Sequence, residues 1–135
     1  MITGLAHIGI AVTDLEEAIA LWTKVTGGKL VHRESVTTQK VEVAVIAVGD
    51  LRVELLAAVS EDSPIVKFVA ARGAGIHHLA LQSTSAQPEL ERLKKAGVRL
   101  IDESPRDSAE NTRVGFLHPK ALGGVLVEIV EHGKP

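Results

Sequence analysis

The stretch LAHIGIAV at residues 5–12 decides the fold, because its pattern returns as IHHLALQS at residues 76–83. Each stretch is an apolar strand pattern with a histidine near its start, His7 in the first and His78 in the second, 71 positions apart. Self-similarity at a fixed offset indicates a repeated supersecondary unit. We therefore interpret the chain as two copies of one unit.

A helix and a second strand are expected after the first copy of the pattern. Asp14 is a typical helix cap with Glu17 three positions later, and an amphipathic helix is expected from there to about Thr26. The glycine pair at 27–28 ends this helix, and KLVH at 29–32 begins a second strand.

The second copy repeats this order. A helix is expected at about 86–96, Gly97 is its stop, and VRLI at 98–101 is expected as the returning strand. Two further pairs of strand patterns match between the copies: VAVI at 43–46 with VGFL at 114–117, and LRVELL at 51–56 with VLVEIV at 125–130.

The last strands place Glu54 of the first copy against Glu128 of the second, 74 positions later. The hairpin before the last strand is therefore three residues longer in the second copy, where HPKALGG at 118–124 makes the turn.

These patterns predict an α+β fold of paired βαβββ modules. The chain is expected to be a single domain, residues 1–135, with copies at about 1–59 and 76–135 joined by a linker helix at 62–73. Four strands with one covering helix leave one sheet face unfilled, so the modules are expected to pair as curved mixed sheets around a cavity.

The composition is that of a globular protein with no general affinity for polyanions. The chain has 135 residues, is 45% hydrophobic, carries a net charge of −2 and has three aromatic residues: Trp22, Phe68 and Phe116. Nucleic acid is therefore not an expected partner. No apolar run approaches bilayer length and the chain enters a strand pattern at once, so we expect no membrane association and a cytoplasmic location.

The chain has no cysteine, so any metal must be held by nitrogen or oxygen donors. Each copy offers an imidazole near the start of its first strand and a carboxylate in its last: His7 with Glu54, and His78 with Glu128. A lone histidine in an apolar strand more often has a structural role. A carboxylate among apolar neighbours, however, costs free energy unless it has a partner. Both features occur twice at matching places in the repeat, which favours a metal site. Two imidazoles and two carboxylates suit a borderline or hard divalent ion and leave positions open for substrate oxygens. We therefore predict a metal-centred cavity.

The other histidines fit this site less well. His77 must point to the opposite face from His78, because side chains alternate along a strand. His32 and His132 lie near strand ends and are interpreted as surface residues. His118, which precedes a proline, could line the cavity mouth or close a turn, and the turn is favoured.

Six segments in order resemble the methylmalonyl-CoA epimerases of the vicinal oxygen chelate superfamily, which also contains glyoxalases, bleomycin resistance proteins and dioxygenases. They are HIGIAV, DSPIVKF, RGAGIHHLAL, AGVRLIDE, FLHPK and GGVLVEIVE. The resemblance implies a metal-dependent isomerase of propionate metabolism. Such an enzyme interconverts (R)- and (S)-methylmalonyl-CoA by 1,1-proton transfer through a metal-stabilised thioester enolate.

The resemblance also implies the residues and partners of the site. The implied metal ligands are His7, Glu54, His78 and Glu128, the ion is of the cobalt, manganese, zinc or nickel type, the substrate is a coenzyme A thioester, and the chain is a homodimer. Arg113 and Lys120 are candidates for binding the anionic coenzyme.

Inversion needs an acid or base on each face of the planar intermediate. The resemblance makes Glu128 one of these bases. In related enzymes the second acid or base is a glutamate on the third strand, where this chain has Val43. Glu42 stands next to it, but strand alternation turns Glu42 to the other face unless a bulge intervenes. Glu42 and a metal-bound water are therefore both candidates for the second proton carrier.

Three other functions of the superfamily are weighed against the epimerase. They are a glyoxalase I type lactoylglutathione lyase, an extradiol dioxygenase, for which the chain is short, and a metal-free drug-binding module, which generally lacks this ligand set. The segments HPKALGG and DSPIVKF favour the epimerase.

Overall fold

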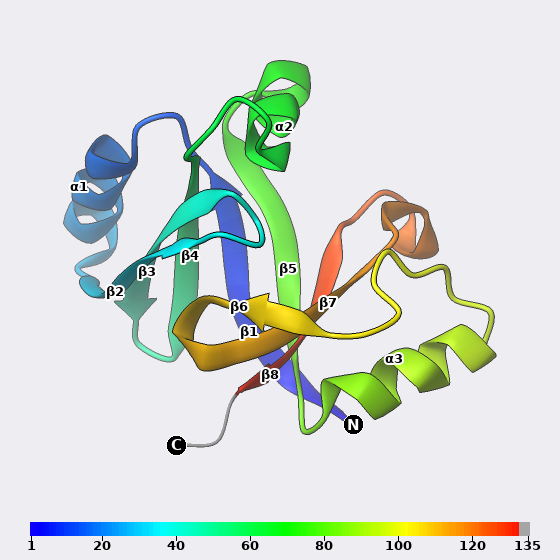
Figure 1. The fold of residues 1–135 in the computed structure, drawn as a ribbon. Coiled ribbons are helices and arrows are strands. Elements are labelled where there is room, and N and C mark those ends of the chain that lie inside the picture. Colours follow the sequence, from blue (N-terminus) through cyan, green and yellow to red (C-terminus); the bar gives the residue numbers. More distant parts are fainter. Residues whose placement is uncertain (133–135) are drawn as a thin grey trace. The chain divides into compact units, whose positions relative to one another are not determined.

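The structure is a computed structural model that describes residues 1–132, so the last three residues of the predicted second copy lie outside the described part. Its contacts divide the chain into two units: the N-unit, His7–His77, and the C-unit, which joins Met1–Ala6 to the chain from His78 onward. Both units combine helices with strands, so the predicted α+β class is confirmed (Figure 1). Among residues 1–132, no helix has both the length and the apolar character needed to cross a bilayer.

The N-unit contains the first βαβββ set and a further helix. Its strands follow the order β2-β3-β4-β1, with β1 parallel to β4 and the other neighbours antiparallel. The elements are β1 (Ile2–Ala11, from His7 onward), α1 (Leu15–Thr26), β2 (Lys29–Val36), β3 (Val41–Val48), β4 (Leu51–Ala58) and α2 (Pro64–Arg72).

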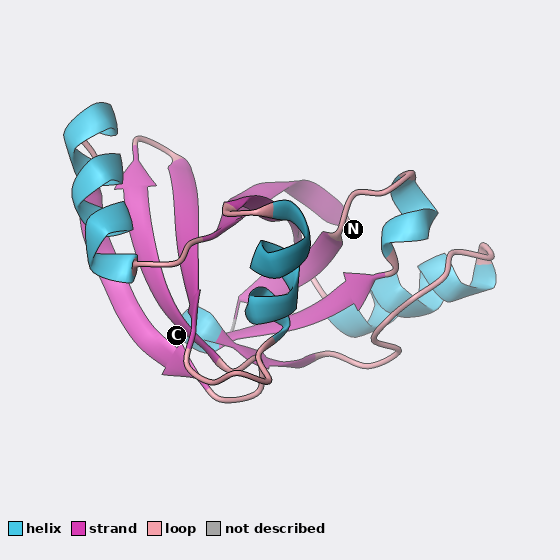
Figure 2. Cartoon of the chain, turned by 90° about the horizontal axis from the view of Figure 1, so that it is seen from above, coloured by secondary structure: helices cyan, strands magenta, loops and turns pink. Residues whose placement is uncertain are grey.

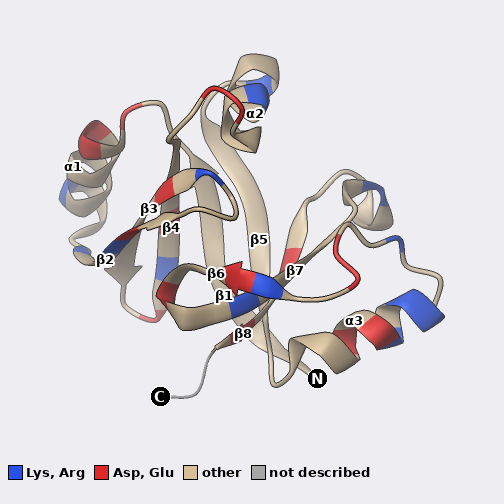
Figure 3. Cartoon of the chain, in the orientation of Figure 1, with Lys and Arg blue, Asp and Glu red and all other residues tan. Residues whose placement is uncertain are grey.

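Helix α1 begins and ends as its sequence predicts. The Asp14 carboxylate accepts a hydrogen bond from the Glu17 amide at 3.0 Å, which satisfies one of the free amides of the first turn. Gly27 ends the helix in the left-handed conformation, with φ of 71°. Acidic residues lie in the first turn and Lys24 in the last, which complements the helix dipole (Figure 3).

Helix α1 covers one face of the N-unit strands (Figure 2). The buried residues of this cluster are Ile10, Leu15, Ala18, Ala44, Ile46, Val53 and Leu55. Full burial of one such aliphatic side chain contributes about 1.5–3 kcal/mol. The alternate residues of the same strands, among them His7 and Glu54, therefore face away from α1.

The C-unit contains the second βαβββ set. Its strands follow the order β1-β5-β8-β7-β6, and β5 runs parallel to β8. The elements are the start of β1 (to Ala6), β5 (Gly75–Ser83, from His78 onward), α3 (Ala86–Lys95), β6 (Arg106–Ser108), β7 (Thr112–Leu117) and β8 (Val127–His132), with short 3-10 turns at Ala109–Asn111 and Pro119–Leu122.

Helix α3 packs on the C-unit strands through Leu90, which is fully buried. Gly115 of β7 makes this close approach possible, since a Cβ atom there would lie 2.6 Å from Leu90 Cδ1. Ile129 and Leu117 complete the contact, so α3 occupies the same place in this unit as α1 does in the other.

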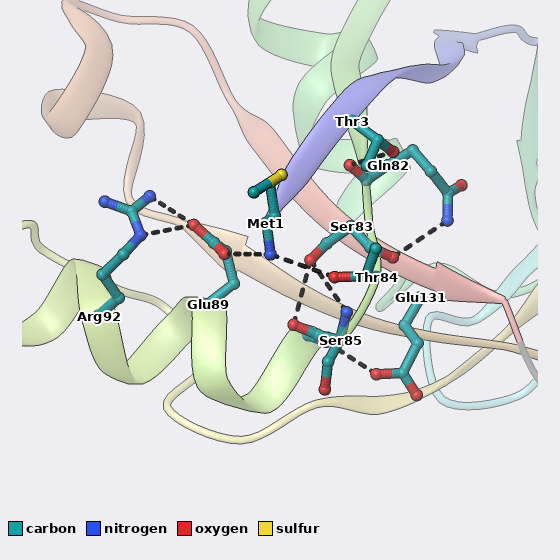
Figure 4. Close-up of polar contacts among 10 residues, drawn as sticks. Met1, Thr3, Gln82, Ser83, Thr84, Ser85, Glu89, Arg92 and Glu131 are labelled. Atoms are coloured by element: carbon teal, nitrogen blue, oxygen red, sulfur yellow. Dashed lines mark hydrogen bonds and ion pairs between the residues drawn. The ribbon is translucent and has the colours of Figure 1, made fainter.

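The first residues of the chain are held by the C-unit. The Met1 amino group lies 2.9 Å from Glu89 Oε2 of α3, and Glu89 also accepts a hydrogen bond from Arg92 Nε at 2.6 Å (Figure 4). Thr3 donates to the Gln82 carbonyl, which ties β1 to β5 in this unit. The first six residues thus belong to the C-unit, although in the sequence they are part of the first copy of the repeat. The internal repeat alone does not indicate this.

The prediction of a strand at 98–101 is wrong. Of these residues only Leu100 forms an isolated bridge, to Leu117, and the returning strand β6 comes later in the chain. The Asp102 amide donates to the Phe116 carbonyl, and the Phe116 amide donates to the Asp102 carboxylate at 2.8 Å. Because the side chain of Asp102 takes the donor that a neighbouring strand would use, regular pairing cannot start there.

Candidate active site

The N-unit places an imidazole beside a carboxylate on the face turned away from α1. His7 Nδ1 lies 2.9 Å from Glu54 Oε2, and their side chains are 8% and 14% exposed. The register of the parallel strands produces this contact, because Gly9 pairs with Glu54 and His7 lies two residues before Gly9 on the same face.

The C-unit repeats the arrangement. His78 Nε2 lies 3.7 Å from Glu128 Oε1, and both side chains are almost fully buried, at 4% and 3% exposure. Ala80 pairs with Glu128 in the parallel strands, just as Gly9 pairs with Glu54. The two copies therefore build the same histidine and glutamate pair from equivalent strands.

These side chains have the right chemistry for a divalent ion. His7, Glu54 and His78 offer ligand atoms that could hold a metal, and Glu128 adds a second carboxylate. Imidazole nitrogen together with carboxylate oxygen suits borderline and hard divalent ions, and a buried carboxylate needs a positive partner. The donor set therefore fits the expected metal.

An aromatic ring and a guanidinium adjoin the C-unit pair. Phe116 pairs with Glu128 across the strands, and its ring makes an edge contact with His78 at 5.7 Å between centroids. Arg106 lies over the Phe116 ring at 5.4 Å, and its buried Nε has no hydrogen-bond partner within residues 1–132. Sequence reasoning missed Arg106, because β6 was expected elsewhere and an isolated arginine carries no periodic signal.

The structure places His77 and His118 outside this site, as expected. The His77 ring packs edge-on against Phe68 of α2 at 4.9 Å, and burial, followed by the charge of Arg72, lowers its pKa to about 4. His118 caps a 3-10 turn, where its Nδ1 accepts a hydrogen bond from the Lys120 amide at 3.1 Å.

The two remaining histidines differ from each other. His132 is exposed, as predicted. His32 is only partly exposed, at 35% of its side chain, and its Nε2 lies 2.6 Å from Glu34 Oε1.

Glu42 lies on the other face from Glu54. The pairing of β3 with β4 is continuous from Val41 to Val48, so no bulge turns Glu42 around. Arg33 Nε donates to Glu42 at 2.8 Å, and the same guanidinium contacts Glu16 of α1. The structure therefore brings Glu42 together with α1, whereas Val43 shares the face of Glu54 and is 1% exposed.

The two basic candidates are exposed, and Arg113 lies on the other face of the sheet from Glu128. Arg113 pairs with Glu131, whose carboxylate accepts the Ala86 amide of α3, so Arg113 lies on the α3 side. Lys120 lies in the 3-10 turn after β7.

Comparison with known proteins places this geometry in a family. The model of the glyoxalase/bleomycin resistance protein/dioxygenase superfamily matches residues 6–116, which is most of the chain. The chain belongs to this superfamily.

Several relatives narrow the assignment. The chain is 37% identical to the uncharacterized protein YqjC of Bacillus subtilis, covering 94% of this chain and 91% of that one. It is 35% identical to the mitochondrial methylmalonyl-CoA epimerase of Homo sapiens, covering 93% and 72%.

Two solved structures share the fold closely. A crystal structure of methylmalonyl-CoA epimerase from Mycobacterium tuberculosis superposes with a TM-score of 0.95 at 41% identity, covering 98% of this chain and 90% of that one. A methylmalonyl-CoA epimerase in complex with methylmalonyl-CoA and ammonium gives a TM-score of 0.93 at 31% identity, covering 98% and 96%. Within the superfamily, the chain belongs to the methylmalonyl-CoA epimerase family, and the resemblance noted from its sequence is confirmed.

Proposed function

We propose that this protein is an epimerase that interconverts (R)- and (S)-methylmalonyl-CoA by 1,1-proton transfer. The observation that carries the proposal is the histidine and glutamate pair built twice, once in each unit, by equivalent parallel strands. The relatives named methylmalonyl-CoA epimerase support the choice of substrate.

We further propose that His7, Glu54, His78 and Glu128 hold one divalent ion of the cobalt, manganese, zinc or nickel type. Each carboxylate is largely withdrawn from water, which supports a cationic partner. When bound, such an ion supplies positive charge that favours loss of the proton next to a thioester carbonyl.

Glu128 is proposed as the acid or base on one face of the substrate. Its carboxylate is 3% exposed and lies on the face shared with His78 and Phe116. A carboxylate in this position can take a proton from carbon and give one back.

Basic residues are proposed to bind the anionic parts of the substrate. Arg106 lies on the Glu128 face, because it pairs with Val114, which in turn pairs with Val130. A carboxylate or phosphate would satisfy its buried Nε, and guanidinium groups suit both anions. The exposed Arg113 and Lys120 are proposed to act further out, on the coenzyme.

We also propose that the chain works as a homodimer in the cytoplasm. On α1, Leu21 and Val25 are one turn apart and are 53% and 82% exposed, so they offer an apolar strip that a second copy could cover. The absence of cysteine suits a reducing compartment. Sedimentation equilibrium with a Val25→Glu variant tests the dimer, which the charge should weaken.

Proton NMR in heavy water tests the proposed activity. The metal-loaded protein should exchange the α-hydrogen of methylmalonyl-CoA for deuterium, and a chelator should stop the exchange. Glu128→Gln should abolish inversion, while Glu61→Gln, a matched change at an exposed position, should leave it intact. Failure of the metal-loaded wild type to exchange the α-hydrogen would reject the function.

A further inference from the structure

The N-unit has a second carboxylate on the face of Glu54, carried by β2. This inference rests on the proposed epimerase function, which requires a proton carrier on each face of the planar intermediate. Val43 has no titratable group, and Glu42 faces α1. Among side chains, the second carrier is therefore sought at another position, as an alternative to a metal-bound water.

The strand register identifies that position. Glu34 of β2 pairs with Val43 of β3, and His32 pairs with Val45, which in turn pairs with Glu54 of β4. Residues paired across strands point to the same face. Glu34 and His32 therefore lie on the face that carries His7 and Glu54.

A β-bulge creates this placement. The pairing of β2 with β3 shifts between Leu30, which pairs with Ile46, and His32, which pairs with Val45. Without the extra residue, His32 would pair with Ala44 and point toward α1. A single-residue shift turns every following side chain of a strand to its other face, and bulges commonly aim side chains at active sites.

The two side chains form a pair that is suited to moving protons. His32 Nε2 and Glu34 Oε1 are 2.6 Å apart, and the side chains are 35% and 34% exposed. The hydrogen bond fixes the carboxylate, while the partial exposure lets the pair exchange protons with water. Val43, by contrast, is buried and has no side-chain group that could form such a hydrogen bond or exchange a proton with water.

We propose that Glu34 is the second catalytic acid and base, and that His32 positions it and passes its proton to solvent. In one direction the Glu34 carboxylate takes the α-proton, the electrons of the broken C–H bond move into the thioester carbonyl, and protonated Glu128 gives a proton to the opposite face. The reverse direction exchanges the two roles. After a turnover in the first direction, His32 transfers the proton held by Glu34 to water and the Glu128 carboxylate takes up a proton from water, so both groups return to their starting states.

Separate measurements of α-hydrogen exchange and of inversion test the proposal in the metal-loaded protein. Each epimer of methylmalonyl-CoA is incubated in heavy water with Glu34→Gln. Exchange is followed by proton NMR, and configuration is followed by circular dichroism. We expect the epimer whose proton faces Glu128 to exchange without inverting, the other epimer not to exchange, and inversion to fall about 100-fold or more.

Two results would overturn this assignment. One is inversion by Glu34→Gln at the wild-type rate, and the other is equal loss of exchange with both epimers in a folded variant. Loss of inversion in Glu42→Gln alone would instead assign the role to Glu42. If the wild type itself exchanges the α-hydrogen of neither epimer, the epimerase function fails, and that outcome is distinct from the two results above.

His32→Gln distinguishes positioning from catalysis. This variant should retain inversion at a reduced kcat with little change in KM, and added imidazole should restore part of the rate, because a free base can replace the proton relay. A rate unchanged by the substitution would show that His32 has no part in the relay.

Discussion

Glu54 carries a negative charge among the proposed ligands, and this charge sets how tightly the ion is held. A carboxylate adjacent to a cation contributes more attraction than a neutral amide, while it also reduces the net positive charge that the ion presents to substrate. His7 contacts Glu54 at 2.9 Å, so the two donors are already oriented together.

Replacing Glu54 with Gln should therefore weaken metal binding by about tenfold, because the shape is kept and only the charge is lost. Isothermal titration with Mn²⁺ or Co²⁺ measures the change. Glu61→Gln, at an exposed position, is the matched control. An unchanged affinity in Glu54→Gln would argue against Glu54 as a ligand.

Arg106 contributes a guanidinium whose Nε lacks a hydrogen-bond partner within residues 1–132. Arg106→Leu should raise KM for methylmalonyl-CoA by about tenfold, equivalent to loss of one charge-assisted hydrogen bond, with a smaller effect on kcat. Steady-state kinetics measure both constants, with Lys95→Leu at the exposed end of α3 as control. A KM equal to that of the wild type would remove Arg106 from the binding site.

At the scale of elements, each helix is fixed on its sheet by a small number of close contacts. Gly115 of β7 lets Leu90 of α3 sit directly on the strand, and an added Cβ would meet Leu90 at 2.6 Å. Gly115→Ala should therefore destabilise the protein by about 1–3 kcal/mol. Urea unfolding measures this loss. When Gly115→Ala and Leu90→Ala are combined in one chain, the loss of stability should be smaller than the sum of the two single losses. Strict additivity would mean that the two residues do not meet.

Glu89 links α3 to the start of β1 within the C-unit. Its pKa is lowered by hydrogen bonds from the Met1 amino group and from Arg92, although burial acts in the opposite direction. Because the pKa is lower in the folded state, the stabilisation is present above the ordinary value of 4.5 and is lost as pH falls through the folded value.

Glu89→Gln should accordingly cost about 1 kcal/mol at pH 7, and this cost should shrink as pH falls below 4.5. Urea unfolding of both proteins across this pH range gives the difference directly. A cost that stays the same throughout would assign the effect to packing instead of charge.

At the scale of the whole molecule, local sequence patterns predicted the elements well. Sequence patterns show features that depend on neighbouring residues. Such features are the helix cap at Asp14, the helix end at Gly27 and the two strands that carry His7 and His78. The matched offsets also indicated which histidine joins which glutamate, because equivalent strands in a repeat share a register.

Features set by the pairing of distant strands could not be predicted in this way. The bulge before His32 and the late start of β6 at Arg106 depend on how one strand meets another. A shift of one residue reverses the face of every following side chain without a change in apolar pattern strong enough to reveal it. For this reason Glu34 and Arg106 became candidates only once the register was known.

The exchange of the α-hydrogen in heavy water tests the central claim most directly. With the divalent ion bound, the wild-type protein should remove the α-proton signal from either epimer of methylmalonyl-CoA and convert each into the equilibrium mixture of the two, and a chelator should halt both processes. A metal-loaded, folded protein that leaves the α-proton signal of both epimers untouched would contradict the account.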